Sequence, residues 1–124
     1  MAFAESNEVV LVVNSGVKGQ HISQGTIRTI FGMRLSDWNE NEVKVFVLPD
    51  DHPIHIVFTK KKLGMFPHQL RWAWDRQVFS GTGRAPIVVN TEEEMRQVVA
   101  STPGAFGYLR RSQVNGSIHE LQIR

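Results

Sequence analysis

A cluster of carboxylates and imidazoles occupies residues 50–55, where the sequence reads Asp50-Asp51-His52-Pro53-Ile54-His55. Neighbouring acids and histidines are the residue types that transfer protons in enzymes. His52 and His55 can also share one helix face, yet the third ligand that a metal site needs at a defined spacing is missing. No nucleophile or substrate pocket is indicated. We therefore predict no enzyme activity and no metal site, and we expect two solvated histidines near a helix cap.

Anion binding is the second chemistry that these residues suggest. Asp50, Asp51 and Pro53 are typical of a helix start, where backbone N–H groups and the positive end of the helix dipole favour a small oxyanion. In open α/β sheets such sites lie beyond the carboxyl ends of strands. The two aspartates occupy the approach, and their charge opposes an anion. Asp51, His52 and His55 are candidate ligand contacts here.

A glycine-rich loop, Ser80-Gly81-Thr82-Gly83 followed by Arg84, supplies further candidates. Glycines allow successive backbone amides to point at an anion. The loop lacks the Lys-Ser ending of a phosphate loop and follows a helix, so a simple turn is the alternative interpretation. Ser15 and Gly16, in a turn-rich stretch after an apolar run, complete the set. The predicted ligand-binding residues are Ser15, Gly16, Asp51, His52, His55, Ser80, Gly81, Thr82 and Arg84, and no cofactor is predicted.

The segment from Arg71 to Arg76 alternates cations with aromatic residues, as base-stacking surfaces do. On a helix Trp72 and Trp74 point about 200° apart, so they cannot form one platform. The formal charge of +2, from 14 basic and 12 acidic residues, also gives no reason to expect a nucleic-acid partner. We predict that Trp74 packs in the core and that Trp72 lies at a rim or a partner surface.

Strands and helices alternate along the chain. Apolar runs and alternating residues predict strands at 9–13, 43–48, 87–89, 105–109 and 118–123. Helices are expected at 24–31 after the N-cap Ser23, at 53–63 before Gly64, from Pro67 to Val78, and from Thr91 to Pro103. Thr91 and Glu94 have the spacing of a capping box. This order predicts an α/β fold with a mixed sheet flanked by helices on both faces.

Length and composition fit one domain, residues 9–124, after a tail at residues 1–8. The 124 residues are 41% hydrophobic and contain no cysteine, which excludes thiol nucleophiles and thiolate metal sites. No apolar run reaches the roughly 18 residues that cross a bilayer, so we expect no membrane insertion. Ala2-Phe3-Ala4 has the small-x-small form of a signal-peptidase site. It predicts a signal peptide removed before Glu5 and a periplasmic protein, and an ordinary short tail is the alternative.

Several motifs together resemble those of the periplasmic phosphate-binding proteins of ABC transporters, and more closely their short single-lobe relatives. The resemblance runs from about Val9 to Leu109. Its motifs are Val12-Val13-Asn14, Ile27 to Gly32 with Trp38, Leu63-Gly64, Phe79 to Gly83 with Pro86, and Thr102 to Tyr108. It implies one lobe of a type II periplasmic-binding-protein-like fold.

In this family phosphate lies between two lobes and is held by backbone amides, hydroxyls, an arginine and an acidic group. The family's Ser-Gly-Thr ligand motif and its preceding arginine align with Leu48 to Ile54. This chain has no hydroxyl or arginine there, and Pro53 removes one amide donor.

The resemblance implies a non-enzymatic, solute-binding-like protein that binds phosphate or another small oxyanion in connection with ABC-type transport. The alternative is a ligand-free interaction module that forms a homodimer or binds a protein partner through Trp72 or residues 115–124.

Overall fold

Strand β1 (Val9–Asn14) lies in the interior of the sheet, and all six of its residues are buried. The structure is a computed structural model and describes residues 7–81 and 84–124. The five strands of the main sheet have the order β6-β5-β7-β1-β8. β5 is parallel to β6 and β7, whereas β1 is antiparallel to β7 and β8. The other bounds are β5 (Lys44–Val47), β6 (Ile87–Val88), β7 (Ala105–Arg110) and β8 (Ile118–Glu120). The predicted mixed sheet is confirmed.

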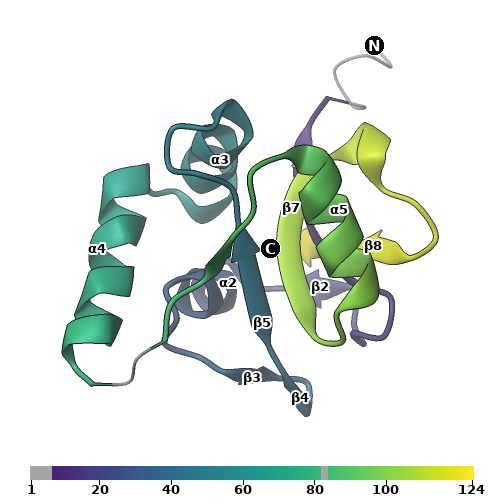
Figure 1. Cartoon of the computed structure of the whole chain (residues 1–124). Coiled ribbons are helices and arrows are strands. Elements are labelled where there is room, and N and C mark those ends of the chain that lie inside the picture. Colours follow the sequence, from purple (N-terminus) through teal and green to yellow (C-terminus); the bar gives the residue numbers. More distant parts are fainter. Residues whose placement is uncertain (1–6, 82–83) are drawn as a thin grey trace.

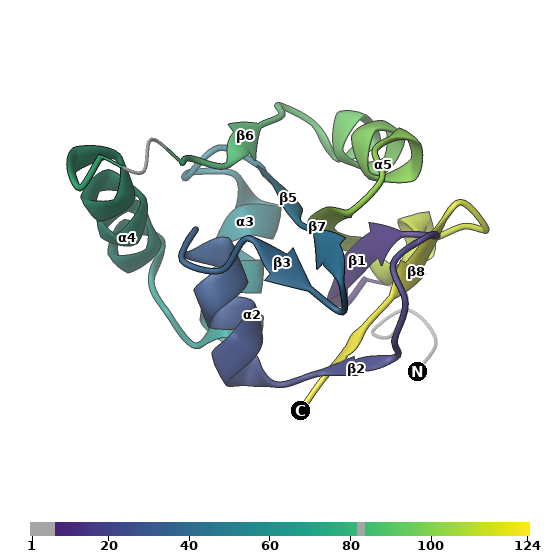
Figure 2. The same cartoon turned by 90° about the horizontal axis from the view of Figure 1, so that it is seen from below.

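Helices cover both faces of this sheet (Figures 1 and 2). α5 packs on β7 and β1 from one side, and α3 packs on the same two strands from the other, next to α2. Gly107 of β7 faces α5, where a Cβ atom would lie 2.6 Å from the sulfur of Met95. The helices are α2 (Gln24–Phe31), α3 (Pro53–Phe58), α4 (Pro67–Phe79) and α5 (Glu92–Ser101). Among the described residues no helix is long and apolar enough to cross a bilayer.

Side-chain caps fix where two helices begin. The Ser23 hydroxyl accepts a hydrogen bond from the Thr26 N–H at 3.0 Å, and the Thr91 hydroxyl accepts one from the Glu94 N–H at 3.1 Å. The predicted helix at 24–31 is confirmed at both ends. The prediction of one α-helix over 53–63 is only half right, because its second half is the π-helix η1 (Thr59–Leu63). Gly64, with φ of +66°, ends this segment as predicted.

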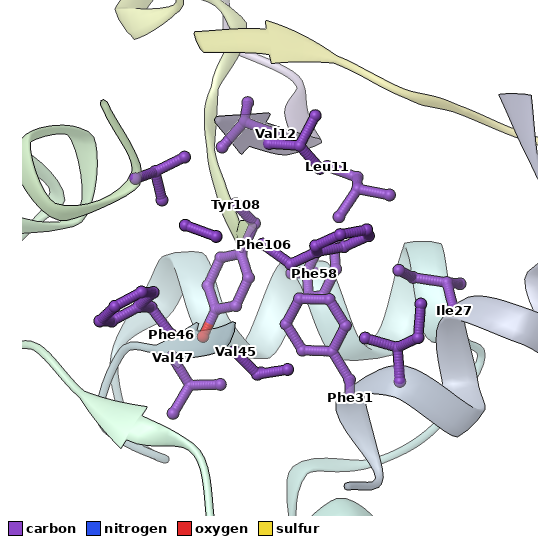
Figure 3. Close-up of a cluster of buried hydrophobic side chains, with 14 of the residues drawn as sticks. Leu11, Val12, Ile27, Phe31, Val45, Phe46, Val47, Phe58, Phe106 and Tyr108 are labelled. Atoms are coloured by element: carbon purple, nitrogen blue, oxygen red, sulfur yellow. The ribbon is translucent and has the colours of Figure 1, made fainter. Parts of the chain in front are cut away.

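An aromatic cluster fills the core between the sheet and the helices (Figure 3). Phe58 stacks on Tyr108 with ring centroids 4.2 Å apart, and Phe31 packs against both rings. The Trp74 indole N–H donates to the Phe31 carbonyl at 2.6 Å, which ties α4 to the end of α2. Trp74 is 2% exposed, so its predicted place in the core is confirmed.

The short pairings near the sheet were not predicted. The region 33–42, for which the sequence predicts no strand or helix, contains a hairpin of β3 (Asp37–Trp38) and β4 (Asn41–Glu42). The expected strand at 118–123 divides at Leu121, which turns into the core and donates its N–H to the Leu11 carbonyl. Beyond it, β9 (Gln122–Ile123) pairs with β2 (His21–Ile22) instead of the main sheet. A 3-10 turn, η2 (Arg111–Gln113), follows β7.

Candidate functional site

The carboxyl ends of β5, β6 and β7 meet at one edge of the sheet, because these three strands are parallel. Asp50 follows β5 at this edge. Arg71 reaches it from α4, and its Nε and Nη2 atoms donate to Oδ2 and Oδ1 of Asp50, both at 3.0 Å. We call Asp50, His52, His55 and Arg71 the strand-end site.

The Asp50–Arg71 pair is held in place yet open to solvent. The Arg71 guanidinium lies over the Trp74 ring at 4.9 Å from its centroid. The hydrogen bond that Arg71 donates to Asp50 raises the pKa of Arg71, so the group stays cationic. The side chains of Asp50 and Arg71 are 39% and 46% exposed. A ligand in solution can therefore reach both a fixed cation and a carboxylate.

His55 lies beneath this pair and is completely buried, so the expectation of two solvated histidines is wrong for His55. The Tyr108 hydroxyl accepts a hydrogen bond from the Leu48 N–H at 2.8 Å and shares a second one with Nδ1 of His55. A hydroxyl oxygen can accept two hydrogen bonds, so the direction of the bond between Tyr108 and His55 depends on the tautomer of the imidazole. Nε2 has no hydrogen-bond partner among the described residues.

Burial also decides the charge of His55. Removal from water disfavours the imidazolium and lowers the pKa of His55 to about 4, although the nearby Asp50 carboxylate opposes this shift. His55 is therefore neutral at physiological pH. Burial likewise raises the pKa of Tyr108 and keeps its hydroxyl protonated.

His52 of the strand-end site lies at the start of α3, and Asp51 borders the site there. Nδ1 of His52 accepts from the Ile54 N–H at 3.1 Å, so the imidazole serves as the helix cap. Asp51 is exposed beside it. In the part of the chain that the structure describes, no three His, Cys, Asp or Glu side chains are grouped to hold a metal ion.

Ser15 and Gly16 lie at the opposite end of the sheet from Asp51 and His52, because they follow β1, which runs antiparallel to β7. The Gly16 N–H donates to the side-chain oxygen of Asn14 at 2.9 Å. The Asn14 amide in turn donates to the Val99 carbonyl, which fixes this turn against α5. The structure therefore does not bring Ser15 and Gly16 to the strand-end site.

The residues of the predicted loop also lie away from it. Ser80 donates its hydroxyl to the Gln77 carbonyl at 3.0 Å, and Gly81 has a φ of +92°. Arg84 precedes β6 and lines a hollow with Lys44 near the start of β5, at the far end of these parallel strands. Thr82 lies outside the described residues.

Sequence reasoning missed Arg71 of the strand-end site and Tyr108, whose hydroxyl is hydrogen-bonded to His55 of that site. The sequence presents Arg71 only as one cation among aromatic residues, although its three-residue spacing from Trp74 already indicates that the two share a helix face. Tyr108 belongs to a recognised motif that assigns it no role. Positions 48–54 contain no arginine, and the guanidinium beside Asp50 comes from a different segment, α4.

A second ion pair occupies another part of the sheet edge at which the parallel strands end. Glu92, the first residue of α5, accepts hydrogen bonds from the Arg110 side chain and from the Arg110 N–H, each at 2.8 Å. The carboxylate is 15% exposed and lies at the positive end of the helix. The N-terminus of α5 therefore already holds an anion from its own chain, and Asp50–Arg71 is the more accessible pair.

Comparison with solved structures identifies proteins with this fold, whereas no family model and no curated protein matches the sequence. A putative phosphate ABC transporter substrate-binding protein with bound phosphate, from Clostridium perfringens, aligns with a TM-score of 0.74 and 14% identity, over 94% of this chain and 44% of its own. An ABC-type phosphate transport receptor from Vibrio cholerae gives 0.61 and 16%, over 94% and 46%.

A third structure, a possible phosphate binding protein from Planctomyces limnophilus, aligns with a TM-score of 0.62 and 12% identity over 94% of this chain and 41% of its own. The chain thus spans less than half the length of each of these proteins. The sequence resemblance is confirmed at the level of the fold. This chain has the fold of the phosphate ABC transporter substrate-binding proteins, to which it is similar over about one lobe's length.

Proposed function

We propose that the protein is a non-enzymatic, single-lobe solute-binding protein of the periplasm that works with ABC-type transport and binds phosphate or a similar oxyanion. The observation that carries this proposal is the accessible Asp50–Arg71 pair at the ends of the parallel strands. Sites at this edge are typical of open α/β sheets. Two proteins that share the fold, one with bound phosphate and one a phosphate transport receptor, support phosphate or a similar oxyanion as the ligand.

The chemistry of the pair favours a protonated oxyanion. A guanidinium donates two parallel hydrogen bonds to a phosphate as it does to a carboxylate, so the ligand takes over donors that Arg71 now gives to Asp50. The Asp50 carboxylate can then accept the hydrogen bond of a phosphate O–H. Sulfate has no proton at neutral pH, and the carboxylate repels it. Phosphate should therefore bind more tightly than sulfate.

The ligand contacts on this side are Asp51 and His52, which flank the pair. The other predicted contacts stay predictions, and they belong to the binding site only if a ligand also touches their loops. These residues are Ser15, Gly16, Ser80, Gly81, Thr82 and Arg84. A single lobe covers a ligand from one side, so the affinity should be weak. His55 is completely buried beneath the pair, so we expect it to support the site from below rather than to contact the ligand.

Titration calorimetry with phosphate and with sulfate at low salt tests this proposal. The wild type should bind phosphate more tightly, and Arg71→Gln should abolish binding. Asp50→Asn should remove the preference for phosphate. Arg96→Gln is the matched control, because Arg96 forms an exposed ion pair with Glu93 away from the site. No heat at millimolar phosphate, or equal binding by the Arg71→Gln variant, would contradict the proposal.

A second candidate function is a protein-interaction or dimerisation module. The exposed Trp72 favours it, since 57% of this large side chain is open to solvent. Residues 115–124 give it less support, because Ile118 and Leu121 are buried and the segment pairs within the chain. Sedimentation at several concentrations distinguishes the two ideas. If the wild type is a dimer and the Trp72→Ala variant is a monomer, the interaction module is favoured. A wild type that stays monomeric at every concentration would count against homodimerisation.

A further inference from the structure

A basic hollow of about 610 Å³ lies between α2 and α4, on a different face of α4 from Arg71. From α4 it is lined by Gln69, Trp72 and Arg76, which recur at positions i, i+3 and i+7 and so share one face of the helix. Arg28 and Gly32 line the opposite wall from α2. Figure 2 shows these two helices as neighbours on the outside of the molecule.

The charge of this hollow is unbalanced. Arg28, Arg34 and Arg76 line it, and no aspartate or glutamate does. Within residues 7–81 and 84–124, none of these three arginines forms an ion pair. Four of the six other arginines of the chain are paired with carboxylates, namely Arg71, Arg96, Arg110 and Arg111. The hollow therefore gathers cations whose counter-charge the described chain does not supply.

One of the three arginines is already positioned. The Nε atom of Arg28 donates to the Leu63 carbonyl at 2.5 Å, where η1 ends. Gly64 makes room for the guanidinium, because a Cβ at this residue would lie 2.7 Å from Nη2 of Arg28. A side chain that is fixed before binding loses less conformational entropy when a ligand arrives. Arg28 is thus prepared to receive an anionic group.

Trp72 adds an apolar surface to the same hollow. It is exposed, and the ring of His68 contacts its edge with centroids 5.0 Å apart. Tryptophan and arginine are the residues most enriched among those that dominate the energy of protein interfaces. We propose that this hollow, the α2–α4 groove, binds an acidic segment of a partner protein. Carboxylates of that segment pair with Arg28, Arg34 and Arg76, and an apolar side chain packs on Trp72.

An acidic protein segment fits these observations better than a nucleic acid does. Nucleic-acid strands need a basic track along many phosphates, and the net charge of the chain is only +2. The three arginines are instead confined to one hollow of a size that ligand groups fill. The proposal does not depend on the strand-end site, because Arg71 is not part of the groove lining.

A binding assay with a defined probe tests the proposal. The probe is a fluorescein-labelled synthetic peptide that places glutamates and leucines on adjacent faces of a helix, measured by fluorescence anisotropy at low salt. A peptide with glutamine at every glutamate position serves as the uncharged control. The double variant Arg34→Gln/Arg76→Gln and the variant Trp72→Ala change only exposed side chains, and circular dichroism verifies that each is folded.

The acidic peptide should bind the wild type. Binding should bury Trp72, and this should shift the tryptophan fluorescence emission of the protein. Each variant should weaken binding by about tenfold or more, whereas Lys18→Gln/Lys61→Gln, which removes the same charge elsewhere, should bind as the wild type does. Arg71→Gln should also leave peptide binding intact, which separates this site from the phosphate site. The proposal would be overturned if the Lys18/Lys61 variant bound the acidic peptide as weakly as the groove variants do. It would also be overturned if the glutamine peptide bound as tightly as the acidic peptide, or if a single-stranded DNA oligonucleotide bound more tightly than the acidic peptide.

Discussion

Asp50 and Arg71 form a bidentate ion pair, although Asp50 follows strand β5 and Arg71 lies in helix α4, 21 residues later in the chain. The pair joins α4 to the strand-end edge and places a cation over Trp74. It brings together an arginine and a carboxylate, the two charged groups on which the proposed phosphate site depends.

Removing this pair should change ligand binding far more than stability. Exposed ion pairs stabilise proteins by about 1 kcal/mol or less, so Arg71→Gln should lower the free energy of unfolding by no more than about that amount. Urea denaturation checks this result, with Arg96→Gln as the matched exposed pair. A loss several times larger than that of Arg96→Gln would show that Arg71 is mainly a structural residue.

The stability of the protein should depend on His55 in mildly acidic solution. The pKa of His55 is about 4 in the folded state, below the value of 6.5 expected when the chain is unfolded. As the pH falls from about 6.5 to about 4, only the unfolded state takes up this proton, so the free energy of unfolding should fall by roughly 3 kcal/mol.

The variant His55→Gln should remove that part of the pH dependence, because glutamine does not titrate. The exposed His21 provides the control, and His21→Gln should keep the wild-type slope. Urea denaturation at several pH values between 4 and 7 measures both. A slope that is the same in His55→Gln and in the wild type would show that other groups cause the acid sensitivity.

Tyr108→Phe should destabilise the fold without changing its shape. The hydroxyl accepts from the buried Leu48 N–H and is hydrogen-bonded to His55, so its removal leaves two buried polar groups unpaired. The expected loss is about 1–3 kcal/mol in thermal or urea denaturation. Thr29→Val also deletes a hydrogen-bonded hydroxyl, but at an exposed site, and it should cost much less. Equal effects of the two variants would contradict the role of Tyr108.

Two glycines should respond to alanine in opposite ways. Gly104 has a φ of +78°, and a Cβ there would lie 2.1 Å from the backbone oxygen of Glu42, so Gly104→Ala should cost well over about 1 kcal/mol. Gly25 lies in α2, and a Cβ atom added there would meet nothing within 4 Å, so Gly25→Ala should stabilise by about 0.5–1 kcal/mol. Thermal denaturation compares them, and a harmless Gly104→Ala would show that the β4–β7 approach is not as close as described.

The elements that the sequence predicts well are those set by local chemistry. The Ser23 cap, the Thr91 cap and the apolar run of β1 depend only on neighbouring residues, and each is confirmed. Gly64 ends its helix for the same local reason, since a positive φ is easiest for glycine. The fold class follows from the order of these elements, which local signals determine.

The candidate site was harder to predict because distant segments assemble it. Ile54, Val57 and Phe58 have the spacing of an apolar face on α3, yet Ile54 and Val57 are only half-buried, whereas His55 is completely buried together with Phe58. The reason is Tyr108, whose hydroxyl gives His55 a buried partner from another strand. Strand pairing likewise places Ser15 away from Asp51, since β1 runs against its neighbour β7. Arg84 also lies away from Asp51, because it precedes β6, which is parallel to β5. Such relationships depend on the sheet order, which spacing along the chain does not encode.

The most direct test of phosphate binding at the strand-end site is to locate a bound phosphate on the protein by NMR. Amide signals of an isotope-labelled sample are followed as phosphate is added, with sulfate in a parallel titration. The account predicts that the largest phosphate-specific shifts fall at Asp50, His52 and Arg71 and disappear in Arg71→Gln. Shifts centred on Ser80 to Arg84 or on Arg28, Arg34 and Arg76, or no shifts at millimolar phosphate, would contradict it.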